Sequence, residues 1–207
     1  MRSMLAALAA VAMFTPAALA RTVSSGTFKT ADGGTIAIQC VEIEGIGTDR
    51  IVLRDSARTK LFDKAGALVF DAQADKIIVT FFTNAGKNTE KANAMIVKSA
   101  ELVGSPKIVY TSKDATTGVV MTTTATSRAA TFDGTEQAAY LTGDVKIVNE
   151  NPALFEGPAV MTGDEAMVNL KSPLGPDDVR FRIRSNPPGL SKIQASPKPR
   201  EGADKKK

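Results

Sequence analysis

The chain of 207 residues contains no histidine, no tryptophan and only one cysteine, Cys40. Without an imidazole, histidine-based catalytic triads and histidine-ligated metal sites are excluded. A single cysteine cannot close an internal disulfide, and its apolar neighbours Ile38 and Val41 are typical of a small buried side chain. Phosphate-binding loops and serine nucleophile motifs are missing too. The sequence therefore predicts a protein that is not an enzyme, with no catalytic residues, no metal and no cofactor.

Long apolar runs are equally scarce, and the one clear example spans residues 4–14. Pro16 follows it, and then the small residues Ala18 and Ala20 stand where signal peptidase would require them. The run is near half of the roughly 20 residues that a membrane-spanning helix needs. Residues 1–20 are therefore interpreted as a cleaved export signal, so that the mature chain begins at Arg21 in an oxidising compartment.

The net positive charge of the chain comes from its end, because basic and acidic residues nearly balance in the body. The formal net charge is +4, and the six basic and two acidic residues from Lys192 onward account for all of it. The stretch from 186 to 207 is also rich in proline and poor in large apolar residues, which predicts a disordered tail. That tail either keeps the chain soluble or lies against anionic lipid head groups. A neutral body with 5% aromatic residues argues against a nucleic-acid partner.

Between residues 21 and 185 the apolar residues recur with a period close to two, which indicates β-strands. Residues 179–184 alternate three apolar side chains with three arginines, as a half-buried strand does. Residues 35–44 change parity near Cys40 and Val41, which predicts a bulge or a bend there. Residues 76–82 are apolar on both parities and are expected to be covered on both faces, and residues 87–100 favour a strand over a short helix. One all-β domain over 21–185 is predicted, built as a sandwich, roll or barrel.

Two stretches of the body echo each other. Residues 100–109 and 139–148 match at six positions with an offset of 39, and the Val-Met-Thr of residues 120–122 recurs at 160–162. This spacing predicts a repeating unit of antiparallel strands that buries its apolar face on its neighbours. The apolar residues of both copies share one parity, so they should point to the same side.

Residues 130–133, the LTGDVKI strand within residues 139–147, and residues 159–170 resemble the OstA-like domain, which occurs in LptA-type periplasmic lipopolysaccharide-transport proteins. The first copy of the echo departs from the pattern, because Pro106 stands where the second has Val145 and a proline cannot donate to a strand ladder. The resemblance implies an antiparallel β-jelly roll, or open taco, with an apolar groove for acyl chains.

The resemblance also implies a function: a non-enzymatic carrier of lipopolysaccharide or a related glycolipid toward the outer membrane. The implied partners, besides the lipid, are other OstA-like or Lpt-type envelope proteins and further copies of the chain, all joined through edge strands. The alternative from a different class is a structural or adhesive β-repeat protein with a dry core, and the sequence leaves open groove and packed core undecided. The candidate groove residues are Ile36, Ile38, Phe70, Leu102, Ile108, Leu141, Val145, Ile147, Val179, Phe181 and Ile183. The candidate head-group contacts are Arg180, Arg182 and Arg184.

Overall fold

The computed structural model describes residues 23–30, 33–82, 97–113, 117–171 and 179–199. These ranges contain thirteen strands in one antiparallel sheet, and they hold no helix with the length and apolar character to cross a membrane. The predicted all-β class is therefore confirmed. The strands are β1 (Ser24–Lys29), β2 (Thr35–Cys40), β3 (Glu42–Ile46), β4 (Arg50–Phe62), β5 (Leu68–Phe81), β6 (Val97–Val103), β7 (Lys107–Lys113), β8 (Val120–Thr126), β9 (Ala129–Asp133), β10 (Ala138–Glu150), β11 (Ala159–Asn169), β12 (Phe181–Arg184) and β13 (Lys192–Gln194).

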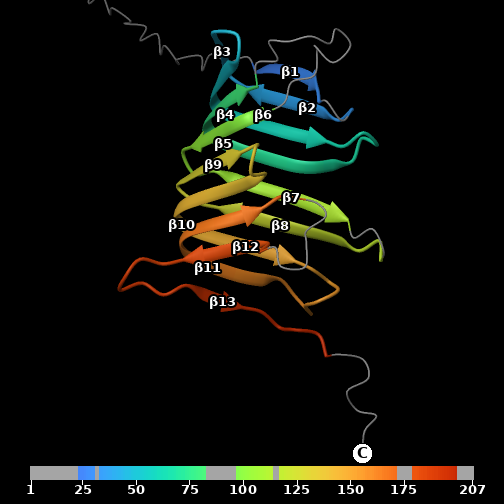
Figure 1. The fold of residues 1–207 in the computed structure, drawn as a ribbon, viewed down its shortest axis with the longest axis vertical. Helices are drawn as coiled ribbons and strands as arrows, with labels where there is room; N and C mark the ends of the chain where they lie inside the picture. Colours follow the sequence, from blue (N-terminus) through green and yellow to red (C-terminus); the bar gives the residue numbers. More distant parts are fainter. Residues whose placement is uncertain (1–22, 31–32, 83–96, 114–116, 172–178, 200–207) are drawn as a thin grey trace, which may run out of the picture.

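The strands follow a meander once the short ones are joined in pairs. β2 continues into β3, β6 into β7, β8 into β9, and β12 into β13, so that each pair is one long strand interrupted by a break. Each long strand then pairs antiparallel with the next one in the chain. As a result the strands stack in chain order along the long axis, from β1 and β3 at one end to β12 and β13 at the other (Figure 1).

Every long strand bends where it passes from one layer of the molecule to the other, and we refer to this line of bends as the fold line. The first halves of β4 and β10 pair with the second halves of β5 and β11 in one layer, which we call the second layer. The remaining halves of these four strands pair with each other in the opposite layer, which we call the first layer. The first layer consists of β1, β2, β7, β8, β13 and the halves of β4, β5, β10 and β11 next to them. The second layer consists of β3, β6, β9, β12 and the remaining halves. Two sheets folded along a seam, as expected for a roll or taco, are thus confirmed.

Three pairs of residues on the fold line have positive φ: Asp55–Ser56, Gly104–Ser105 and Gly143–Asp144. The first and third pairs form bulges within continuous strands, and the second separates β6 from β7. The second and third pairs occupy matching places in the two echoed stretches. The two echoed stretches therefore contain the same bend with positive φ. Only the first copy interrupts the strand ladder, because Pro106 has no backbone N–H to donate.

Inward-facing residues form two rows on each layer, and each row follows the cross-strand register. The first inward row lies nearer the fold line, and the second lies nearer the open ends of the strands. In the first layer the first row is Ile38, Thr59, Ala72, Ile108, Ala125, Ile147, Met161 and the second row is Ile36, Leu61, Phe70, Tyr110, Thr123, Asn149, Ala159. In the second layer the first row is Leu53, Ile77, Leu102, Ala130, Leu141, Ala166, Ile183 and the second row is Ile51, Val79, Ala100, Phe132, Ala139, Val168, Phe181.

Several local expectations can be compared with the strands. The parity change near Cys40 is confirmed, because β2 ends there and β3 begins after Val41. Cys40 is 1% exposed, and burial raises the pKa of its thiol, as expected for a structural cysteine. The arginine-rich strand begins at Phe181 and not at residue 179. Full cover on both faces of residues 76–82 is wrong, because Ile77, Val79 and Phe81 are buried while the outward positions remain partly exposed.

The predicted disorder from residue 186 is wrong for residues 186–199. Within this stretch β13 pairs with β11, Glu156 donates its backbone N–H to the carbonyl of Ser196, and Lys198 donates to Leu154. The side chains here are exposed, so backbone pairing on a free sheet edge holds the segment without apolar burial. The export signal, residues 87–96 and residues 200–207 lie outside the described residues.

Candidate functional site

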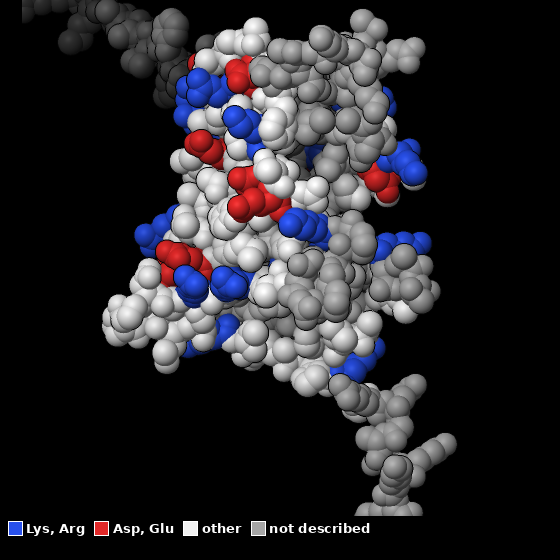
Figure 2. Space-filling view, in the orientation of Figure 1, with Lys and Arg blue, Asp and Glu red and all other residues white. Residues whose placement is uncertain are grey.

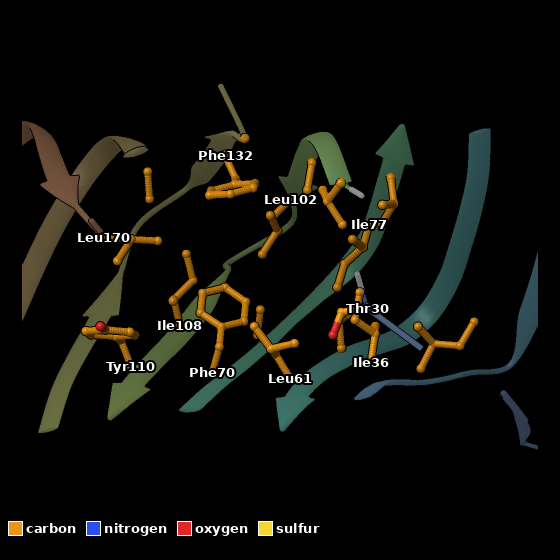
Figure 3. Close-up of a pocket in the computed structure, with 18 of the residues that line it drawn as sticks. Thr30, Ile36, Leu61, Phe70, Ile77, Leu102, Ile108, Tyr110, Phe132 and Leu170 are labelled. Atoms are coloured by element: carbon orange, nitrogen blue, oxygen red, sulfur yellow. The ribbon is translucent and has the colours of Figure 1, made fainter. Parts of the chain in front are cut away.

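A cavity of about 490 Å³ lies between the two layers, in the part of the stack formed by β1, β2, β4 to β7, β9 and the start of β10. Inward side chains from both layers line it, so that two opposed rows face each other across the space (Figure 3). Phe70 and Ile108 stand on the first layer, whereas Leu102 and Phe132 stand on the second. The volume falls in the range of sites that hold small or flexible ligands.

The residues that line this cavity are mostly aliphatic or aromatic. None of those described carries a formal charge, and the polar ones are threonines together with Tyr110 and Gln137. Such a surface binds alkyl chains through the hydrophobic effect, at about 0.8 kcal/mol for each methylene taken out of water. Among the described lining residues there is no aspartate, glutamate, lysine, arginine or cysteine.

Five of the predicted groove residues line the cavity: Ile36, Ile38, Phe70, Leu102 and Ile108. They come from β2, β5, β6 and β7, which are far apart in the sequence. The register brings them together, since Ile36 and Phe70 both flank Leu61 in the second inward row.

The predicted residues of the later strands lie elsewhere. Leu141, Val145 and Ile147 are at most 1% exposed and belong to a closed part of the core. Phe181 and Ile183 on β12 are half-buried against the far end of that core, and Val179 is exposed. None of these six lines the cavity.

The three arginines also separate in space. Arg182 and Arg184 project from the outward face of β12, where their cross-strand neighbours are Met167 and Glu165. Arg180 instead donates from Nη1 to the backbone carbonyls of Asn169 and Lys171, at 3.1 and 3.3 Å. Those carbonyls flank Leu170, which lines the cavity, so Arg180 supports the cavity wall through the backbone.

Sequence analysis missed several lining residues, most of them in the second inward row or its continuation. Leu61, Val79 and Phe132 lie in the second inward rows, and the sequence analysis did not single them out. Other missed residues are Phe28, Ile51, Ile77, Phe81, Tyr110 and Leu170, and the polar Thr30 and Thr59. The sequence does not show whether an inward residue lies near the fold line or near the open ends of the strands, because that depends on the register between strands.

Charged groups lie on the outer surfaces. Arg58 donates from Nε to Asp71 Oδ1 at 2.8 Å on the outside of the first layer, and a second bond from Nη2 makes the pair bidentate. The hydrogen bonds from Arg58 hold the pKa of the Asp71 carboxyl below its usual value. On the face shown in Figure 2, charges of both signs are scattered among uncharged side chains. These charged groups therefore lie outside the cavity, whose described lining is uncharged.

No protein-family model matches the chain, and no curated protein matches its sequence. Among solved structures, the chain resembles LptH from Pseudomonas aeruginosa, described as the LptA-homologous periplasmic component of the conserved lipopolysaccharide transport device. The two share 12% sequence identity with a TM-score of 0.52, over 79% of this chain and 95% of LptH. They share a fold. The folded pair of sheets inferred from strand register is thus an LptA-like architecture.

Proposed function

We propose that this chain is a periplasmic carrier that holds the acyl chains of lipopolysaccharide or a related glycolipid in the cavity between its layers. The observation that carries the proposal is the uncharged cavity of about 490 Å³, because a purely structural stack of sheets would have a packed core without such a cavity. The shared fold with LptH, a lipopolysaccharide-transport component, supports the same class of ligand. The alternative is a structural protein whose core is packed throughout. A packed core is found mainly in the later strands, β8 to β13.

The mechanism is passive. Alkyl chains enter between the sheets, where apolar contacts replace water, and no side chain in the cavity wall changes the lipid covalently. Sugars and phosphates stay outside, because burying them without partners is costly. The energy for directed transport comes from elsewhere, since the wall has no group that binds or hydrolyses a nucleotide.

The proposal includes export by cleavage after residue 20, a mature domain from residue 21, and pairing with Lpt-type proteins or further copies through the sheet ends. Within the described residues, β1 pairs only with β2, and β13 pairs only with β11. Both strands therefore offer a free backbone edge of the kind that a further strand extends.

Photocrosslinking in cells tests the ligand. A photoreactive amino acid at Phe70, in the cavity wall, should capture lipid, whereas the same amino acid at Phe181, at the dry end of the core, should not. Mass spectrometry of the adduct then reads the lipid class. Failure to capture lipid at both Phe70 and Ile108 would contradict a carrier, and an adduct of phospholipid alone would contradict the glycolipid.

A further inference from the structure

The outward faces of the two layers differ in charge. At the outward positions that the register pairs, the first layer presents seven cations and two carboxylates: Lys29, Arg58, Lys60, Lys107, Lys113, Lys146 and Lys192 against Asp71 and Glu150. The second layer presents five of each: Arg50, Arg54, Lys76, Arg182 and Arg184 against Glu42, Glu44, Glu101, Asp133 and Glu165. The first-layer outer face is therefore positive, whereas the opposite face is balanced.

Four of the first-layer cations fall in a single cross-strand row, which we call the basic row. Its members are Arg58 on β4, Lys107 on β7, Lys146 on β10 and Lys192 on β13. The register links them through uncharged residues on the strands between, Gln73, Thr126 and Thr162. Neighbouring strands lie about 4.8 Å apart, so a cation recurs about every 10 Å. Because the strands stack along the long axis (Figure 1), the row follows that axis.

Three members of the basic row present their charge to solvent. Lys107, Lys146 and Lys192 are exposed, and the ion pairs of the described residues are those of other cations, Arg54, Arg58 and Arg128. The charge of Arg58 is offset by its bidentate bonds to Asp71. The other carboxylate of this face, Glu150, lies opposite Thr122, away from the basic row. The three lysines are therefore available to an external anion.

The rest of this face is rich in hydroxyl and amide groups. The cross-strand neighbours of the three lysines within the basic row are Gln73, Thr126 and Thr162. A hollow of about 570 Å³ lies at the β1 end of the same face, and its outward lining residues are Ser25, Thr27, Ala37, Gln39, Arg58, Lys60 and Phe62. Hydroxyl and amide groups both donate and accept hydrogen bonds, as the hydroxyls of a sugar require.

We propose that the outer face of the first layer binds a linear acidic polysaccharide laid along the strand stack. Carboxylates of the polymer pair with Lys107, Lys146 and Lys192, and its hydroxyls bond to the threonines and glutamines between them. An anionic bilayer also attracts lysines, but faces that enter membranes carry bulky apolar anchors between their cations. Here threonine and glutamine occupy those positions, which favours the polysaccharide.

This surface is separate from the cavity. Lys107 points outward and its neighbour Ile108 points into the cavity, so the first-layer sheet lies between the two sites. The polymer and a lipid in the cavity therefore bind independently, and the inference goes beyond the proposed carrier function.

Binding of lipid-free polymers to the purified exported chain tests the proposal. The acidic probes are hyaluronan, with a carboxylate on every second sugar, and polygalacturonate, with one on every sugar, and dextran is the uncharged control. We expect an acidic probe to bind and dextran not to bind, with an affinity that falls as salt is added because salt screens exposed charges. The triple variant Lys107→Gln, Lys146→Gln, Lys192→Gln should weaken binding about tenfold to hundredfold, as three exposed ion pairs of about twofold to fivefold each provide.

Two matched variants separate the row from net charge. Changing the same three lysines to arginine keeps the charges and should keep the affinity within about twofold. The triple variant Arg50→Gln, Arg54→Gln, Lys76→Gln removes three charges from the second layer and should also leave the affinity within about twofold. All of these side chains point outward, and thermal melts check that each variant is folded.

The outcomes separate this inference from the carrier function. If neither acidic polymer binds, or if both glutamine variants lose affinity equally, the basic row is not a polysaccharide site. Binding to phosphatidylglycerol vesicles in place of the polymers, lost in the row variant, would make the face a membrane surface and would also overturn the proposal. Lipid capture at Phe70 tests the cavity on the other side of the sheet, so the carrier function stands or fails by itself.

Discussion

The two ends of the strand stack share the same antiparallel pairing of bent strands but differ in their interiors. The cavity half, β1 to β7, supplies most of the cavity lining, whereas in the dry half, β8 to β13, inward residues such as Leu141, Ile147 and Met161 are buried without lining the cavity, and Phe132 and Ala139 are among the few that reach it. Ile108 and Ile147 show the contrast, because they occupy the same inward row but only Ile108 lines the cavity. Strand pairing alone therefore does not decide whether folded sheets enclose a groove or a core.

The second inward row explains the difference. In the cavity half its first-layer members are large and apolar, and they include Leu61 and Phe70. In the dry half the corresponding positions are small or polar, and Asn149 Nδ2 donates to Thr123 Oγ1 at 2.8 Å. In the first layer the cavity half therefore has large apolar residues at two depths, whereas the dry half has them at one depth only.

The largest expected effect comes from truncating the same residue in each half. Ile147→Ala should lower the free energy of unfolding by about 4 kcal/mol, because it opens a new hole in a packed core. Ile108→Ala should cost about 2 kcal/mol, since one side of Ile108 already faces the cavity. Urea denaturation measures both, and equal losses would mean that the two halves are packed alike.

Enlarging an alanine should follow the same pattern, with the larger loss of stability in the dry half. Ala72 and Ala125 flank Ile108 on its two sides in one row, but only Ala72 lines the cavity. Ala125→Leu should destabilise the protein by about 2 kcal/mol through overpacking. Ala72→Leu should change stability by less than about 0.5 kcal/mol and weaken fatty-acid binding by occupying its space. Thermal melts and a lipid-displacement assay report the two effects, and unimpaired binding by Ala72→Leu would contradict the site.

The glycines of the fold line should differ between its two ends. A Cβ added at Gly104 would lie 2.1 Å from Asp75 Oδ2 and 2.6 Å from its Cβ, whereas one added at Gly143 would lie 2.9 Å from the exposed side chain of Arg128. Both positions have positive φ. Gly104→Ala should therefore cost about 2 kcal/mol and Gly143→Ala about 1 kcal/mol. Denaturation midpoints measure the difference, and the reverse order would contradict this account of the bends.

The smallest effect concerns the outer face of the cavity half. Because the pKa of Asp71 is lowered in the folded state, its pairing with Arg58 stabilises the protein above the ordinary carboxyl pKa of about 4 and less so as the pH falls below it. Asp71→Asn should cost about 1 kcal/mol at neutral pH and nothing in strong acid. The exposed pair of Arg128 and Asp144 in the dry half is the control, and Asp144→Asn should give no measurable change. A pH-independent loss for Asp71→Asn would exclude the ion pair as its cause.

The features that the sequence predicted are those that depend on residues close together in the chain. Alternation along a strand is local, so it identified several of the strands and the break after Cys40, but it did not separate the two faces of residues 76–82. Strand β13 escaped prediction, because Lys192–Gln194 is held by backbone bonds to the free edge of β11 and its exposed side chains give no signal. The groove list was drawn from both halves for a similar reason, since Ile108 and Ile147 look alike in the sequence.

The sequence by itself determined the all-β class of the body and the echo between residues 100–109 and 139–148, because these depend on residue type and short-range spacing. The tertiary structure alone decided how deep each inward residue lies and where the two layers stay apart. These properties depend on cross-strand neighbours that lie tens of residues away, and only the assembled register brings such neighbours together.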